Sequence, residues 1–132
     1  MARRRGLILL TGGADAISGA GKADGAHVSL RQRAARGRGG GLLTAAAHDL
    51  REIGLANRMG VDLVFLSPLF PTRSHPGAPA LGPLRFASLA RASRAPVIAL
   101  GGMTERRFRR MKALGAYGWA GIDGLVGRSE DR

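Results

Sequence analysis

Two adjacent glycines between an apolar run and a helix start are the strongest candidate binding feature of the sequence. The run Pro96–Leu100 leads directly into Gly101 and Gly102, and Thr104 is placed to cap the helix that follows. Glycine leaves backbone N–H groups accessible, and a helix start adds a positive dipole, so this spacing predicts an anion site. The alternative is a tight strand-to-helix turn in which the glycines only supply positive φ angles.

A polar, proline-rich segment at residues 67–82 offers groups that suit the same kind of ligand. Thr72, Arg73, Ser74 and His75 combine hydroxyls with cations, which match the oxygens of a phosphate. The prolines restrict the unfolded loop and so lower the entropy cost of ordering it. Long loops in compact domains are usually functional or mobile, and we expect this one to bind a ligand.

Two ionisable residues stand directly after predicted strands. His48 follows the apolar run Leu42–Ala47, and Asp123 follows the last run, Tyr117–Ile122. An imidazole with a pKa near neutrality suits general acid–base chemistry, although a histidine at a strand end also serves as a hydrogen-bonding cap. Asp123 is open to two interpretations, a metal ligand or the cap of a turn. His27 lies within a predicted strand and is expected to be structural.

The positions of these residues depend on an alternation of short apolar runs with helical patterns. Such an alternation is typical of parallel α/β folds, in which ligands gather beyond the carboxyl ends of the strands. Strands are expected at residues 6–10, 26–30, 42–47, 61–66, 96–100 and 117–122. Helices are expected at residues 15–22, 49–60, 82–93 and 104–115. We expect one domain over residues 1–132, with a flexible basic loop at 31–41 and a polar tail at 128–132.

Composition argues against several classes of protein. The 132 residues suffice for one domain, and a hydrophobic content of 45% argues against a disordered basic tail. No apolar run approaches the length of a membrane span, about 18 residues, and the start of the sequence does not read as an export signal, so we expect a cytoplasmic protein. Cysteine is absent, which excludes disulfides, thiolate metal sites and cysteine nucleophiles.

The basic character of the chain needs a separate explanation. The net charge of +12 (21 basic minus 9 acidic residues) would suit a nucleic-acid partner, because phosphate neutralisation dominates such binding. The arginines are scattered, however, and aromatic residues, which would supply stacking platforms, make up only 5% of the chain. Nucleic-acid binding is therefore not the expected function.

Three stretches together resemble a known enzyme superfamily. The segment VDLVFLSPLFPTRSHPGAPALGPLRFASLA at residues 61–90, followed by APVIALGGMT at 95–104, is similar to the thiamine phosphate synthase and thiazole tautomerase superfamily. Residues 41–60, GLLTAAAHDLREIGLANRMG, resemble the fifth strand and following helix of that superfamily. The resemblance is specific from residue 42 to about 125, and it implies an α/β fold of the TIM (β/α) barrel type.

The resemblance also implies a reaction. In the synthases of the family, a hydroxymethylpyrimidine pyrophosphate and a thiazole phosphate join to give thiamine phosphate and pyrophosphate, with magnesium (Mg²⁺). Pyrophosphate leaves, a carbocation-like centre develops on the pyrimidine, and the thiazole nitrogen attacks it. Positioning and charge neutralisation then supply most of the catalysis. The expected partners are therefore the two phosphorylated substrates.

Several residues match positions that contact substrates in the family. Gly101–Gly102 match the glycines whose amides hold the thiazole phosphate, and Thr72 and Ser74 match two hydroxyl positions that grip substrate phosphates. His75 falls where many synthases have a lysine, so its contribution is expected to depend on pH. His48 matches the histidine that the tautomerase branch uses for proton transfer.

Other positions depart from the family pattern. The Asn-Asp pair that ends the family's third strand, in which the Asp helps to hold Mg²⁺, is replaced by Thr11–Gly13. The metal ligand is then either missing or displaced to Asp15. Asp123 stands where a serine usually contacts the phosphate, and an ionised carboxylate there would repel a phosphate dianion.

The number of strands is a further departure. The six predicted strands align with the third to eighth strands of the family's barrel, so we expect an incomplete barrel without the first two βα units. We favour a start upstream of Met1 as the explanation, with a degenerate gene or closure by self-association into a homo-oligomer as the others. Two alternative functions stay open. They are a thiazole tautomerase-like isomerase with His48 as acid–base, and a non-catalytic binder of a phosphorylated thiazole.

Overall fold

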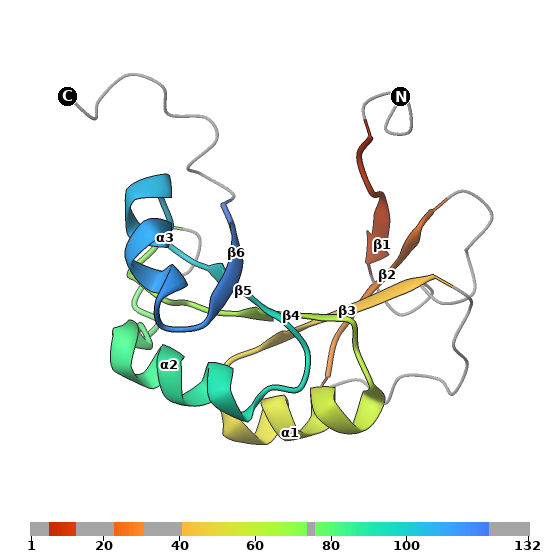
Figure 1. Ribbon diagram of the computed structural model, residues 1–132, viewed down its shortest axis with the longest axis horizontal. Helices are drawn as coiled ribbons and strands as arrows, with labels where there is room; N and C mark the ends of the chain where they lie inside the picture. The colour runs from red at the N-terminus through yellow and green to blue at the C-terminus, as the bar shows by residue number, and fades with distance from the viewer. Residues whose placement is uncertain (1–5, 13–22, 31–40, 74–75, 122–132) are drawn as a thin grey trace.

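The computed structural model describes residues 6–12, 23–30, 41–73 and 76–121 of the chain. Its strands are β1 (Leu10–Gly12), β2 (Gly25–Val28), β3 (Leu42–Ala47), β4 (Leu63–Leu66), β5 (Val97–Leu100) and β6 (Ala116–Ala120). The helices of this part are α1 (Leu50–Met59), α2 (Gly82–Ala92) and α3 (Glu105–Lys112) (Figure 1). From β3 onward a helix connects each strand to the next, which confirms the predicted alternation.

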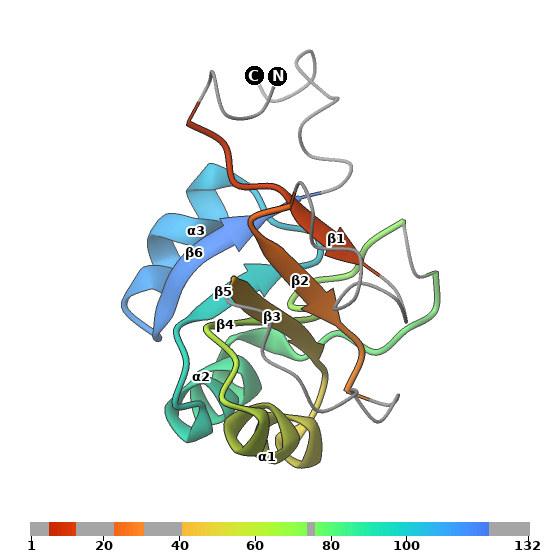
Figure 2. The ribbon, with the colours of Figure 1, turned by 90° about the vertical axis from the view of Figure 1, so that its right-hand side faces the viewer.

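The strands form one parallel sheet whose spatial order follows the chain, β1-β2-β3-β4-β5-β6. Figure 2, seen from the end at which β1 lies, shows neighbouring strands rotated against one another, the twist that curves the sheet. Helices α1 and α2 lie on one side of the sheet, and α3 lies beside β6 (Figure 1). Within the described residues β1 and β6 are open edges, so the sheet is an arc of a (β/α) barrel rather than a closed one.

The register of the paired strands shows which side chains lie on each face of the sheet. Because paired residues of neighbouring parallel strands point to the same side, Ala45, Val64 and Val97 share one face. All three are buried in the same core cluster as Ile53 of α1 and Phe86 of α2. This face is therefore the one that the helices cover, and its burial stabilises the fold by removing apolar surface from water.

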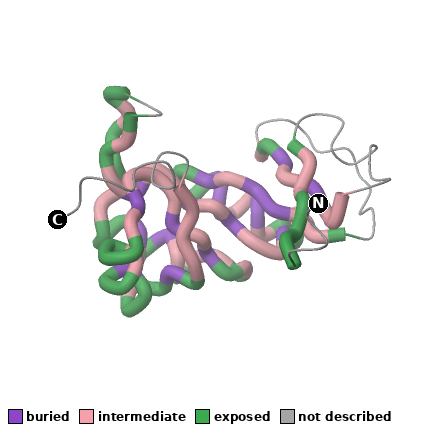
Figure 3. Tube along the Cα trace, turned by 90° about the horizontal axis from the view of Figure 1, so that it is seen from above, coloured by how far each residue is buried: buried purple, intermediate pink, exposed green. Residues whose placement is uncertain are grey.

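The opposite face of the sheet carries His27, Thr44, Phe65 and Ile98. Thr44 is buried, whereas the other three are only partly buried. Figure 3 shows buried and intermediate residues mainly along the inner part of the chain trace and exposed ones mainly at its outer parts. In a closed barrel this face would line the interior.

Capping residues mark the ends of helix α1 and the start of helix α3. Asp49 accepts a hydrogen bond from the amide of Glu52 at 2.8 Å, and Gly60 ends α1 in the left-handed conformation. The carboxylate of Glu52 accepts from the amide of His48 at 2.7 Å, one residue earlier than the Asp49 amide of a standard capping box. Thr104 caps α3, as expected.

Two aspartates each make a pair of hydrogen bonds that joins the amino ends of two neighbouring strands. Asp24 accepts from the amide of Leu9 at 2.9 Å and donates its own amide to the Leu9 carbonyl at 2.7 Å. Asp62 makes the same pair of bonds with Leu43, at 2.8 and 2.7 Å. These bonds pair backbone groups just before β2 and β4, where the ladders begin.

The first predicted strand is wrong in its position. Of residues 6–10 only Leu10 belongs to β1, and Leu7, Ile8 and Leu9 are 57%, 64% and 47% exposed. An apolar run becomes a buried strand only where another layer packs on it, and no described helix covers these residues. The remaining strands and helices lie within about three residues of their predicted bounds. The expected helix at 15–22, residues 31–40 of the basic loop and the tail at 128–132 lie outside the described residues.

Helices α2 and α3 each bury part of their apolar residues. Phe86 and Leu89 are buried, whereas Leu84 is 86% exposed. Met111 of helix α3 is buried, and Phe108 and Leu114 pack against the core. Among the described helices none is long and apolar enough to cross a membrane.

Candidate functional site

Three neighbouring strands, β3, β4 and β5, bring His48, Ser67 and Gly101 to one edge of the sheet. The Nδ1 atom of His48 lies 2.8 Å from the carbonyl oxygen of Ser67 and 3.4 Å from its hydroxyl oxygen. A carbonyl accepts only, so the shorter contact requires a proton on Nδ1, and Nε2 of a neutral ring is then an acceptor. His48 is exposed, so this nitrogen is accessible from solvent.

The segment that follows β4 (residues 67–71) is seated on, that is, hydrogen-bonded to and packed against, the turn that follows β5 (Gly101 and Gly102). The amide of Leu69 donates to the Leu100 carbonyl at 2.9 Å, and the amide of Phe70 donates to the Gly101 carbonyl at 3.1 Å. On its far side the segment is bonded to the start of α2, where the amide of Gly82 donates to the Leu69 carbonyl at 3.0 Å. Two segments far apart in sequence therefore form one layer at the carboxyl ends of the strands.

The seating explains why the turn contains glycine at both positions. Gly101 and Gly102 have φ angles of 98° and 60°, which side-chain-bearing residues rarely adopt. A Cβ atom on Gly101 would stand 2.8 Å from the Cα of Pro68, and one on Gly102 would stand 2.7 Å from the Pro71 carbonyl oxygen. Any larger residue would thus push the overlying segment away.

The carbonyls and the amides of this turn differ in their hydrogen bonding. The carbonyls of Leu100 and Gly101 accept the two bonds from the overlying segment, and that of Gly102 accepts from Arg107. The amides of Gly102 and Met103, by contrast, donate to no partner among the described residues. Two free amides next to the start of a helix are the groups that bind an anion.

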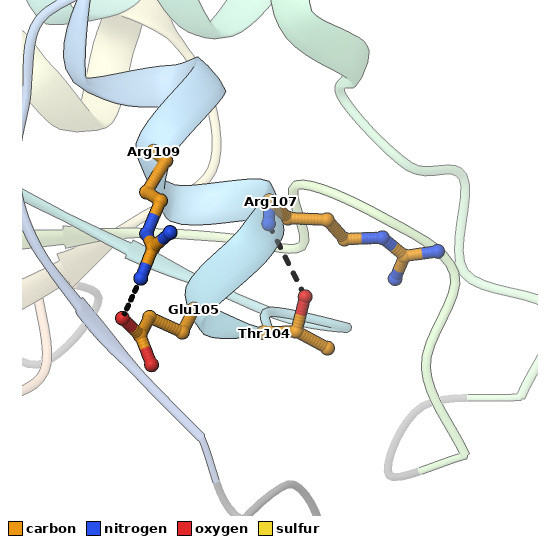
Figure 4. A network of polar contacts seen from close by, with 4 residues as sticks. All are labelled: Thr104, Glu105, Arg107 and Arg109. Carbon is orange, nitrogen blue, oxygen red and sulfur yellow. Dashed lines mark hydrogen bonds and ion pairs between the residues drawn. The ribbon is translucent and has the colours of Figure 1, made fainter. Parts of the chain in front are cut away.

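Helix α3 begins at this turn and directs one arginine back over it. The hydroxyl of Thr104 accepts from the amide of Arg107 at 3.2 Å (Figure 4). The side chain of Arg107 reaches away from the helix, donates from Nη1 to the Gly102 carbonyl, and places its guanidinium 4.6 Å from the centre of the Phe70 ring. Arg109 instead pairs with Glu105 at 2.6 Å on the exposed surface of the helix (Figure 4).

The structure brings some of the predicted phosphate-binding residues together. Gly101 and Gly102 form the turn, and Thr72 follows the segment seated on it, where it is half-buried. His48 lies at the same edge of the sheet, beside Ser67. The other predicted site residues lie outside the described residues; they are Asp15, Ser74, His75 and Asp123.

Sequence reasoning missed three residues at this edge: Ser67, Phe70 and Arg107. Ser67 directly follows a predicted strand, so the rule that singled out His48 would have found it. Phe70 looks like an ordinary apolar loop residue. Arg107 is one of many arginines, and no local pattern distinguishes it.

A second histidine belongs to the interior face of the sheet. His27 Nδ1 lies 2.9 Å from the hydroxyl of Thr44, and its ring meets the Phe65 ring edge-on with centroids 5.5 Å apart. Burial lowers the pKa of His27 from its ordinary value of 6.5, so the ring is neutral at pH 7. Thr44 is fully buried, so its hydroxyl depends on this bond. These contacts fit the structural role predicted for His27.

The described residues contain no cluster of metal-ligating side chains. Within the four described ranges no three Asp, Glu or His side chains gather closely enough to hold a metal ion. The carboxylates of Asp24, Asp49 and Asp62 accept from backbone amides. The predicted ligand Asp15 lies outside these ranges.

Comparisons with known proteins find a matching family and similar relatives. A family model described as thiamine monophosphate synthase matches residues 1–125. The chain is 36% identical over 74 residues to the thiamine-phosphate synthase of Syntrophomonas wolfei, a match that covers 55% of this chain and 35% of that protein. It is 34% identical over 110 residues to the thiamine-phosphate synthase of Anoxybacillus flavithermus, covering 79% of this chain and 51% of that protein. The chain thus spans about a third to a half of these curated relatives.

A solved structure supports the fold. The thiamine phosphate pyrophosphorylase from Pyrococcus furiosus is similar with a TM-score of 0.74 and 20% sequence identity. The match covers 98% of this chain and 64% of that chain. At this identity the likeness establishes the barrel architecture of the chain and leaves its chemistry to other arguments.

Proposed function

We infer the function from the premise that this chain belongs to the thiamine monophosphate synthase family, whose model matches residues 1–125. We propose that it acts in thiamine biosynthesis, as a transferase that joins hydroxymethylpyrimidine pyrophosphate to thiazole phosphate. In this proposal the Gly101–Gly102 turn holds the thiazole phosphate.

One observation carries the proposal more than any other: the amides of Gly102 and Met103 have no hydrogen-bond partner within the part of the chain that the structure describes. A phosphate oxygen accepts hydrogen bonds and donates none, so it complements a pair of donors better than a neutral ligand does. The start of α3 adds a positive potential at the same place. Glycine also allows close approach of the ligand to the backbone.

The second substrate would meet the segment seated on the turn. Thr72 offers a hydroxyl there, and we propose that Ser74 and His75 continue the same contact with the pyrophosphate. His75 contributes a positive charge only when protonated, so its help would fade above its pKa. Asp123, proposed beside the thiazole phosphate, would oppose a dianion unless it is protonated or paired.

The proposed reaction needs positioned charge rather than a covalent intermediate with the protein. The carbon–oxygen bond to pyrophosphate breaks, and the lone pair of the thiazole nitrogen forms the new carbon–nitrogen bond. The negative charge leaves with pyrophosphate, while the ring nitrogen becomes positive. A turn that holds the thiazole phosphate in line with that carbon lowers the entropy cost of the encounter.

Three properties expected from the sequence accompany this proposal. Mg²⁺ would neutralise the leaving pyrophosphate, as the family resemblance implies, with Asp15 as the proposed ligand. Self-association is favoured by the two open edges of the described sheet. A cytoplasmic location agrees with a biosynthetic role.

The test is release of pyrophosphate from the two substrates, with Mg²⁺ or with EDTA. We expect release only when both substrates are present, and a loss of about tenfold or more for Thr72→Val, because a hydrogen bond to a charged group is worth roughly 1.5–3 kcal/mol. Thiazole phosphate alone should raise the melting temperature. A raised melting temperature without any pyrophosphate release would indicate a non-catalytic binder, and no effect of either kind would refute the proposal.

The isomerase alternative is not favoured. The relatives that the chain resembles are named as synthases. Turnover of a thiazole tautomer that depends on His48 would reverse this order of preference.

A further inference from the structure

We propose that Arg107 is a positioning residue that holds the Gly101–Gly102 turn and the overlying segment in the arrangement that binds phosphate. The residue touches no substrate in this proposal and acts through backbone groups and Phe70. The inference rests on the proposed function for its consequence in catalysis. Its structural part stands on contacts within the described residues.

The directions of the Gly102 and Met103 amides follow from the hydrogen bonds that the carbonyls of Gly101 and Gly102 accept. In a trans peptide the C=O and the following N–H point in opposite directions. The Phe70 amide holds the Gly101 carbonyl at 3.1 Å and so directs the Gly102 amide away from it. Arg107 holds the Gly102 carbonyl and so directs the Met103 amide. Without these bonds, glycines in this turn are free to rotate their peptides.

Arg107 also connects the two peptides through an aromatic ring. Its guanidinium lies 4.6 Å from the centre of the Phe70 ring, while the Phe70 backbone bonds to Gly101. A planar guanidinium can stack on a ring and donate in its own plane at the same time. A lysine ammonium has no such plane, so Lys would keep the charge without the double contact.

The other arginines of α3 provide matched controls. Arg110 is exposed on the same helix, and its side chain makes no hydrogen bond or ion pair among the described residues. Arg109 pairs with Glu105 instead of turning back to the loop. Substitution of Arg110 therefore removes one positive charge from α3 and leaves the turn intact.

The first experiment measures amide hydrogen exchange in the ligand-free protein. We expect Arg107→Met to speed exchange of the Phe70 amide about tenfold or more, with little change at Val64 in the core and none at Phe70 for Arg110→Met. Arg107→Lys should resemble Arg107→Met. Unchanged exchange at Phe70 in Arg107→Met, or full rescue by Lys, would overturn the proposal.

The second experiment uses thiazole phosphate and the pyrophosphate-release assay. A positioning role predicts that Arg107→Met raises the KM for thiazole phosphate about tenfold with a smaller change in kcat, and that Lys does not restore it. Restoration by Lys would show that charge alone matters and would contradict the proposal. If the unmodified chain releases no pyrophosphate, the proposed function fails, while the ligand-free exchange still decides whether Arg107 holds the turn.

Discussion

Replacing Gly102 by alanine tests whether the overlying segment is seated on the turn as described. The residue has a φ of 60°, and a Cβ there would stand 2.7 Å from the Pro71 carbonyl oxygen and 2.9 Å from the Cβ of Phe70. Gly60 is a matched control at the end of α1. Its φ is 65°, and a Cβ on it would meet nothing within 4 Å.

Both substitutions place an alanine at a positive φ, and only Gly102→Ala also creates a steric clash. A left-handed conformation costs an alanine roughly 1–2 kcal/mol, so Gly60→Ala should lower the free energy of unfolding by about that amount. Gly102→Ala pays the same cost and also has to displace Pro71 and Phe70, and overpacking of this kind costs about 1–3 kcal/mol. We therefore expect Gly102→Ala to be more destabilising than Gly60→Ala by roughly 1–3 kcal/mol.

Urea denaturation of both variants measures this difference, provided that the slopes with denaturant agree. The same samples show whether thiazole phosphate still raises the melting temperature. We expect the ligand effect to survive in Gly60→Ala and to disappear in Gly102→Ala. Equal destabilisation of the two variants would refute the seating of the segment, and a retained ligand effect in Gly102→Ala would refute the turn as the phosphate site.

Two further predictions concern stability. Burial lowers the pKa of His27 below 6.5, so the unfolded chain binds the proton more readily, and the free energy of unfolding should fall as pH drops through about 6.5. His27→Gln cannot titrate and should flatten the change between pH 7 and 5 in denaturant titrations; an unaltered slope would contradict the assignment. Asn57 donates to the Ala92 carbonyl and accepts from the Arg94 amide, both at 2.9 Å, so Asn57→Ala should cost about 1–3 kcal/mol. Asn57→Asp keeps the acceptor and should cost less than Asn57→Ala; the reverse order would count against this bridge.

Much of the fold was predictable because the signals are local. Asp49 and Gly60 bound α1 through hydrogen bonds and a φ angle that involve residues within one turn of the helix. The same holds for Thr104 and α3. The runs that became β3 and β5 are short and rich in apolar residues, as is typical of strands in a parallel sheet.

The burial of individual apolar residues was less predictable. Leu7, Ile8 and Leu9 form an apolar run but remain exposed, whereas Phe86 rather than Leu84 enters the core. Hydropathy describes what a residue gains by burial. Whether a partner layer exists at that position depends on elements that lie far away in sequence.

The sequence by itself determined the alternation of strands and helices, the caps, and a glycine turn able to present amides. Only the tertiary structure decided which groups meet there. His48 meets Ser67 because β3 and β4 are neighbours, and Phe70 reaches Gly101 because β4 and β5 are. Arg107 gains its role only when the segment after β4 lies over the turn after β5. Such contacts are set by strand order and register, which a one-dimensional pattern of residues does not encode.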